Sequence, residues 1–211
     1  AEICEVSIKP YMEHLYVQPG DSIHLEIDFK DMLHPVITGS GADLNKQITQ
    51  FTEGGFYMPR YSHWKEFETQ EEFDQIMEKE YQERLKRYEE YVQKYQPTDV
   101  VKQYINDMLK ADYYKALFSN LNQFAYTRNQ KIDIRQYTDK LKEAALLLDN
   151  QTIIESNFGL TENMYNHLHL LNERYWKGDQ SLTLEEVMEP LKDTPAIPYI
   201  FARGLSISLN K

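Results

Sequence analysis

The chain has 211 residues, of which 23 are basic and 34 are acidic, so its formal net charge is −11. Hydrophobic residues make up 41% and charged residues 27%, which is typical of a globular protein and excludes a disordered one. The acidic excess disfavours nucleic-acid binding, and no apolar run approaches the roughly 18 residues that a membrane-spanning helix needs. The single cysteine excludes an internal disulfide, a C-x-x-C redox pair and a cysteine-based zinc site.

Residues 1–41 are predicted to form a small β region. Apolar side chains at every second position from 23 to 29 alternate with polar ones, which is the period of a strand with one buried face. Before this run, Gln18-Pro19-Gly20-Asp21 is typical of a type II turn, because proline presets one central position and glycine tolerates the positive φ of the other. We expect a hairpin of strands 13–17 and 22–29, another strand at 2–8 and a short one at 36–38.

From Gly41 onward, apolar residues recur at helical spacing. The clearest pattern is an amphipathic helix of about seven turns, which begins near the capping-box pair Thr69 and Glu72 and ends at Pro97. The next segment, from Thr98 to about residue 125, has a wide apolar stripe, so we expect this helix to be covered on more than one side. Further helices are expected at 42–51, 133–148, 161–177 and 194–211, with shorter helical segments at 151–158 and 183–188.

These patterns predict an α+β fold that is mostly α. A small N-terminal antiparallel β region (residues 1–41) packs on a bundle of about five to seven helices (residues 42–211), which form one compact unit. The first residue is Ala and not Met, so we expect a processed or excised chain. The last helix has no stop signal, since its apolar side runs on to Leu209, and this favours a chain that is cut before a C-terminal domain.

The polar motifs of the chain do not predict catalysis or a bound cofactor. Gly39-x-Gly41 lacks the third glycine of a dinucleotide-binding loop, and we interpret it as a tight strand-to-helix turn. His24, Glu26 and Asp28 share one strand face, but alternating polar residues are what any solvent-exposed strand face shows. We therefore expect no metal site, no cofactor and no catalytic residue in this chain.

Four aromatic residues lie close together in a connector, where loops normally stay polar: Phe56, Tyr57, Tyr61 and Trp64. They either seal the junction between the strand region and the helices or form a contact surface, since aromatic platforms bind sugars and peptides. We favour the seal, because exposing all four would create an apolar patch that a monomer rarely tolerates. The contact surface for a glycan or peptide stays open as the alternative.

Two segments together resemble a known family: Leu15-Tyr16-Val17-Gln18-Pro19-Gly20-Asp21-Ser22-Ile23 and Gly39-Ser40-Gly41-Ala42-Asp43-Leu44-Asn45. They are similar to the N-terminal region of TlpA/ResA-type thioredoxin-like proteins of the Gram-negative cell envelope. In that family a Y-x-x-P-G-D turn leads to G-x-G-A-x-x-N, then to a helical segment and a thioredoxin domain. The resemblance is specific over residues 15–45 and only architectural over 60–211.

The resemblance implies a location in the periplasm or at the outer membrane of the cell envelope, often with a lipid anchor on the precursor. It also implies thiol–disulfide exchange by the thioredoxin-like domain of the parent protein. The redox motif of the family, C-x-x-C, is absent from this chain, so no catalytic residue carries over. The chain would then be a non-catalytic accessory domain that docks a protein or peptide partner, positions the reductase or holds a substrate. The alternative is a self-contained envelope binding protein for a glycan or peptide.

Overall fold

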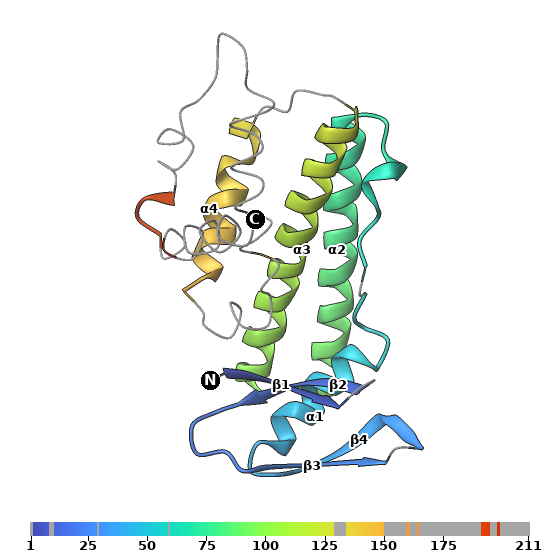
Figure 1. Ribbon diagram of the computed structural model, residues 1–211, viewed down its shortest axis with the longest axis vertical. Coiled ribbons are helices and arrows are strands. Elements are labelled where there is room, and N and C mark those ends of the chain that lie inside the picture. Colours follow the sequence, from blue (N-terminus) through green and yellow to red (C-terminus); the bar gives the residue numbers. More distant parts are fainter. Residues whose placement is uncertain are drawn as a thin grey trace. The chain divides into compact units, whose positions relative to one another are not determined.

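The computed structural model describes residues 2–8, 11–28, 30–58, 60–128, 134–149, 160, 164, 191–194 and 198 (Figure 1). Four strands are followed by helices, which confirms the predicted α+β class with a small N-terminal antiparallel β region and a mostly helical remainder. The described residues hold four α-helices and two short 3₁₀ helices, fewer α-helices than the five to seven expected. The helices expected at 151–158, 161–177, 183–188 and 194–211 fall almost entirely outside the described residues.

Two antiparallel hairpins make up the β region. β1 (Glu2–Ile8) pairs with β2 (Tyr11–Val17), and β3 (Ile23–Asp28) pairs with β4 (Asp31–Gly39). The expected hairpin of strands 13–17 and 22–29 is therefore wrong, and the short strand expected at 36–38 is part of the longer β4. Each strand pairs with the neighbour from which only two residues separate it, and two-residue connections are the commonest hairpin loops.

The predicted turn before β3 is present, although it joins two hairpins and does not close one. The Asp21 N–H donates to the Gln18 carbonyl oxygen at 3.0 Å, and Gly20 has a φ of 91°. The predicted alternation of β3 is also confirmed, since Ile23, Leu25 and Ile27 are half-buried while the residues between them are exposed. Local turn and strand signals thus gave the right elements but not their pairing.

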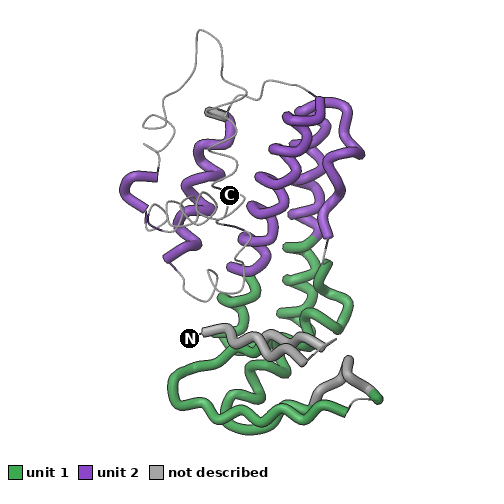
Figure 2. Tube along the Cα trace, viewed as in Figure 1, with its two compact units in different colours: residues 1–59, 84–106 green, residues 60–83, 107–211 purple. Residues whose placement is uncertain are grey.

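The chain forms two compact units (Figure 2). Unit 1 comprises residues 1–59 and 84–106, and unit 2 comprises residues 60–83 and 107–211. Two long helices contribute to both units: α2 (Gln70–Tyr95) and α3 (Asp99–Arg128). The units do not follow the boundary at residue 41 that the sequence suggests, because segments 42–59 and 84–106 group with the strands.

In unit 1, α1 (Ala42–Thr52) contacts both β2 and β4. A small apolar cluster of Leu15, Ile37 and Ala42 lies where these elements meet. At the other end of α1, the fully buried Phe51 packs its ring on three tyrosines of the same unit, namely Tyr57, Tyr88 and Tyr91. These contacts fix α1 between the strands and the adjoining segment of α2.

Unit 2 contains the larger hydrophobic core. Besides parts of α2 and α3, it includes η1 (Trp64–Glu66), η2 (Ile134–Tyr137) and α4 (Thr138–Leu147). The inward stripe predicted for the 133–148 helix is confirmed, because its four members are all at most 2% exposed: Tyr137, Leu141, Ala144 and Leu148. The stripe of α3, which continues into unit 1, is as wide as predicted, because three residues outside its main line are also buried: Ile105, Leu109 and Leu117.

Helix ends follow the predicted signals in part. The hydroxyl of Thr69 accepts a hydrogen bond from the Glu72 N–H at 3.1 Å, as a capping residue does. In a capping box the Glu72 carboxylate would accept from the N–H of Thr69. Here it accepts from the N–H of the preceding residue, Glu68, at 3.0 Å. At the other end, α2 stops at Tyr95, before Pro97, as the sequence predicts.

Candidate functional site

The two segments that carry the family resemblance meet in one hydrogen-bonded cluster of unit 1. The Asp21 carboxylate accepts from the Gln18 N–H at 2.8 Å and from the Ser40 hydroxyl at 3.4 Å. The Ser40 hydroxyl also accepts from the Ser22 N–H at 2.8 Å, and the Ser40 N–H donates to the Ser22 carbonyl at 3.0 Å. The turn before β3 and the turn after β4 are therefore tied to each other through Asp21 and Ser40.

Asn45 connects α1 to β2 in the same cluster. Its side chain is buried, its Nδ2 donates to the Tyr16 carbonyl at 2.9 Å, and its Oδ1 accepts from the Tyr16 N–H at 2.9 Å. Nδ2 also donates to the Gly41 carbonyl at 2.9 Å. The amide of Asn45 thus bonds to β2 as a neighbouring strand would, which only an asparagine or glutamine amide can do.

The two glycines of Gly39-Ser40-Gly41 are required by close packing. Gly39 has a φ of 105°, and a Cβ there would lie 1.9 Å from the Ser22 carbonyl oxygen. A Cβ on Gly41 would lie 2.8 Å from the Asp21 carboxylate. This geometry is that of the tight strand-to-helix turn that we expected.

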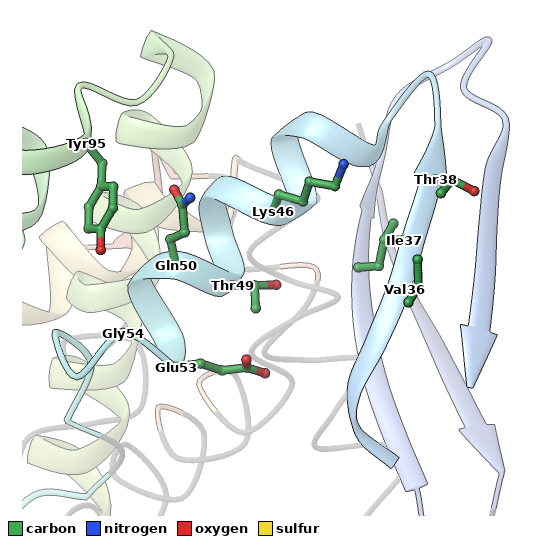
Figure 3. Close-up of a pocket in the computed structure, with 9 residues that line it drawn as sticks. All are labelled: Val36, Ile37, Thr38, Lys46, Thr49, Gln50, Glu53, Gly54 and Tyr95. Atoms are coloured by element: carbon green, nitrogen blue, oxygen red, sulfur yellow. The ribbon is translucent and has the colours of Figure 1, made fainter. Parts of the chain in front are cut away.

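A groove of about 650 Å³ runs between β4 and α1 in unit 1 (Figure 3). One wall is the β4 segment of Val36, Ile37 and Thr38. The opposite wall is one face of α1, and Gly54 and Tyr95 also line the groove. The volume falls in the range of binding sites for small molecules and cofactors, which is about 300–1,000 Å³.

The rim of this groove holds exposed apolar side chains. Val36 is 54% exposed and Tyr95 is 37% exposed, and both are among the few large hydrophobic side chains that the described residues leave in solvent. The Lys94 ammonium lies 4.9 Å from the centre of the Tyr95 ring, which orients that ring by a cation–π contact. Sequence reasoning missed this groove, because its walls come from a strand edge and a helix that have no common motif.

The four aromatic residues of the connector are divided between the units. In unit 1, Phe56 packs edge-on against Tyr91 at 5.7 Å, and Tyr57 packs on Phe51 at 6.1 Å. In unit 2, Tyr61 and Trp64 are half-buried against the core. Each residue therefore has aromatic or apolar neighbours in its own unit, and whether the four act as a seal or as a contact surface stays a prediction.

A network of tyrosines and charged side chains lies in unit 2. The Tyr137 hydroxyl donates to Asp74 at 2.7 Å, Lys140 donates to the Tyr113 hydroxyl at 2.5 Å, and the Tyr114 hydroxyl donates to Glu143. These bonds connect η2 and α4 to α2 and α3. Helical spacing predicts that tyrosines lie on inward stripes, but it does not identify these charged partners.

The electrostatics of this network keep its tyrosines neutral. Tyr81 stacks on Tyr113 with the ring centres 4.4 Å apart, and burial, followed by nearby carboxylates, raises the pKa of Tyr81 to about 12. Burial and a hydrogen bond to a carboxylate raise the pKa of Tyr114 and Tyr137 still further. Burial also raises the pKa of Asp74, against the Tyr137 hydrogen bond and the charge of Lys140. A tyrosine with a raised pKa donates hydrogen bonds but is a poor general base near neutral pH, so the network is suited to holding helices together.

The polar residues that the sequence analysis considered as metal ligands lie on one exposed strand face. The side chains of His24, Glu26 and Asp28 point to the exposed face of β3, and among the described residues no three His, Cys, Asp or Glu side chains are grouped as metal ligands would be. The side chain of Cys4 lies outside the described residues. Within the described part of the chain, no helix combines the length and the apolar character that crossing a membrane requires.

Comparisons with models of protein families, with curated proteins and with solved structures found no match to this chain. The function is therefore inferred from the residues of the chain and from the contacts within each unit.

Proposed function

We propose that this chain is a non-catalytic accessory domain of a thiol–disulfide oxidoreductase-like protein of the cell envelope. In this role it interacts with a protein or peptide partner or substrate, or positions the reductase. The observation that carries the proposal is that segments 15–23 and 39–45, which together resemble TlpA/ResA-type proteins, form one hydrogen-bonded cluster.

This cluster shows why the two resembling segments would occur together in one domain. Asp21 of the first segment bonds to Ser40 of the second, and Asn45 of the second bonds to Tyr16 of the first. Each segment needs the other, because either half alone would leave buried polar groups without partners. A match to both halves is therefore a match to one structural element and supports descent from the same domain.

The absence of a second thiol supports a non-catalytic role. A dithiol enzyme cycles between a reduced pair and an internal disulfide, and Cys4 is the single cysteine of the chain. Redox chemistry in the parent protein would therefore belong to a C-terminal thioredoxin-like domain.

The reading frame of the gene beyond Lys211 tests this proposal. A downstream domain with a W-C-x-x-C segment between a strand and a helix is the expected result. A stop codon directly after Lys211, or a downstream domain without that motif, contradicts it.

A second candidate, a self-contained envelope binding protein for a glycan or peptide, is favoured by one observation. The groove between β4 and α1 has the volume of a ligand site and exposed apolar side chains at its rim. The same reading of the gene separates the two candidates, because this second function expects the stop codon.

A further inference from the structure

We propose that the groove of unit 1 binds an extended peptide segment of a partner protein, which adds to β4 as a further strand. The inference rests on the proposed function for its biological setting, and it deepens that function by naming the surface and the chemistry of the partner. Strand addition is a common mode of peptide recognition, in which main-chain hydrogen bonds give affinity and the flanking walls select side chains.

The groove follows the edge of β4 and not one of its faces. Val36, Ile37 and Thr38 are consecutive and all line the groove. Successive side chains of a strand point to opposite faces, and Ile37 is buried while Val36 and Thr38 are exposed. Residues from both faces share the groove only where it runs along the strand edge (Figure 3).

The hydrogen-bonding pattern of the hairpin shows which groups this edge presents. The Ser40 N–H bonds to the Ser22 carbonyl, and the register continues from that pair through Ile23–Gly39 to His24–Thr38. Antiparallel pairs alternate between those that exchange hydrogen bonds and those that do not.

It follows that Val36 and Thr38 direct their N–H and C=O groups toward β3, and that Ile37 and Gly39 direct theirs away from it. Among the strands that the structure describes, none pairs with this outer edge. The backbone groups of Ile37 and Gly39 are thus placed to bond to another extended chain.

The α1 wall supplies the side-chain selectivity. Four residues spaced as on one helix face line it, with the two charged ones at its ends: Lys46, Thr49, Gln50 and Glu53. Lys46 and Glu53 are about 10 Å apart along the helix axis. A peptide that has an acidic and a basic side chain on the same face, four residues and about 13 Å apart, complements these two charges. The Asp43 carboxylate lies 3.9 Å from the Lys46 ammonium, and its side chain is 92% exposed, so it competes only weakly for Lys46.

Pairing with a second copy of the chain fits this edge less well. If two β4 strands paired in register about Ile37, Pro35 of each would lie opposite Gly39 of the other. Proline has no N–H, so each of these outer pairs would lack one hydrogen bond. With a foreign peptide only the missing N–H of Pro35 in β4 remains, so one hydrogen bond is lost and not two, and we therefore assign the edge to a partner segment.

The test uses the isotope-labelled chain and an acetylated, amidated heptapeptide of sequence Thr-Glu-Val-Thr-Val-Lys-Thr at millimolar concentration. Binding should shift the backbone amide NMR signals of Ile37 and Gly39. Two further peptides are N-methylated, one at the second, fourth and sixth residues and the other at the third and fifth. The N–H groups of alternate residues in an extended peptide point to the same edge, and only one edge faces β4. Only the peptide whose methyl groups lie on the opposite edge should therefore bind.

Matched variants test whether the peptide binds in the groove. Gln50→Trp fills the groove and should weaken binding by about tenfold or more. Thr52 is exposed on the same helix but does not line the groove, so Thr52→Trp should change the dissociation constant by less than about twofold. Lys46→Glu should reverse the preference between this peptide and one with Lys in place of its Glu.

Three results would overturn the inference. They are no shift at the two amides, equal binding of both methylated peptides, or concentration-dependent self-association that produces the same shifts without peptide. Each result concerns the chain alone, so such a failure would leave the reading-frame test of the proposed function unaffected.

Discussion

The side-chain amide of Asn45 bonds to both backbone groups of Tyr16, although 29 residues separate the two in the sequence. Both distances are 2.9 Å, and both residues are buried. This pair fixes α1 to β2 and thereby helps to set one wall of the groove.

Asn45→Ala should therefore destabilise the chain. It leaves the buried N–H and C=O of Tyr16 without partners, at a cost of about 1–3 kcal/mol for each group. Urea denaturation followed by circular dichroism measures this loss, with the exposed Gln50→Ala as the matched helix control. Equal midpoints for the two variants would contradict the assigned role of Asn45.

Gly39→Ala should cost much more than Gly20→Ala. Both glycines have a positive φ, which costs an alanine about 1–2 kcal/mol. A Cβ on Gly39 would also lie 1.9 Å from the Ser22 carbonyl oxygen, whereas one on Gly20 meets nothing within 4 Å. The free energies of unfolding should differ clearly, and similar losses would show that the turn relaxes around the new side chain.

Trp64→Ala should lower the melting temperature by several degrees, because Trp64 packs against the core of unit 2. At this chain length about 1 kcal/mol shifts the midpoint by about 2–4 °C. Tyr126→Ala removes an aromatic side chain that is 58% exposed and is the control. An unchanged melting temperature, with a solvent-accessible Trp64 in fluorescence quenching, would favour the contact surface for a glycan or peptide.

Asp74→Asn should gain stability relative to the natural chain as pH rises. Burial raises the pKa of Asp74 above 3.8 in the folded state, so ionisation of this carboxyl costs folding free energy. That cost is absent below the unfolded pKa and is complete once pH exceeds the folded pKa. Urea denaturation at several values from about pH 4 to pH 7 measures the difference. A constant difference, or one that falls as pH rises, would contradict the direction of this shift.

The sequence predicted those features that depend on neighbouring residues. Turn 18–21, the alternation of β3 and the inward stripe of α4 each follow from local geometry. Strand pairing was mispredicted because the alternation within a strand does not indicate which strand it pairs with. In the structure, each strand pairs with the neighbour from which two residues separate it. The groove and the Asn45–Tyr16 pair could not be predicted, since both bring together residues distant in the sequence.

The tyrosines illustrate the same limit. Helical spacing correctly placed Tyr137 on the buried face of its helix. It could not indicate that the Tyr137 hydroxyl bonds to Asp74, or that Tyr113 and Tyr114 bond to Lys140 and Glu143. Helical spacing defines a face, whereas the hydrogen-bond partners come from other helices.

The central claim is that the chain is a non-catalytic accessory domain of a thioredoxin-like protein, and an insulin-reduction assay with dithiothreitol tests it most directly. The rate is measured for residues 1–211, for the same chain with Cys4→Ser, and for the product of the complete reading frame. We predict that the first two have equal, uncatalysed rates and that the complete product accelerates reduction. Acceleration by residues 1–211 above the Cys4→Ser control, or an inert complete product, would contradict the account.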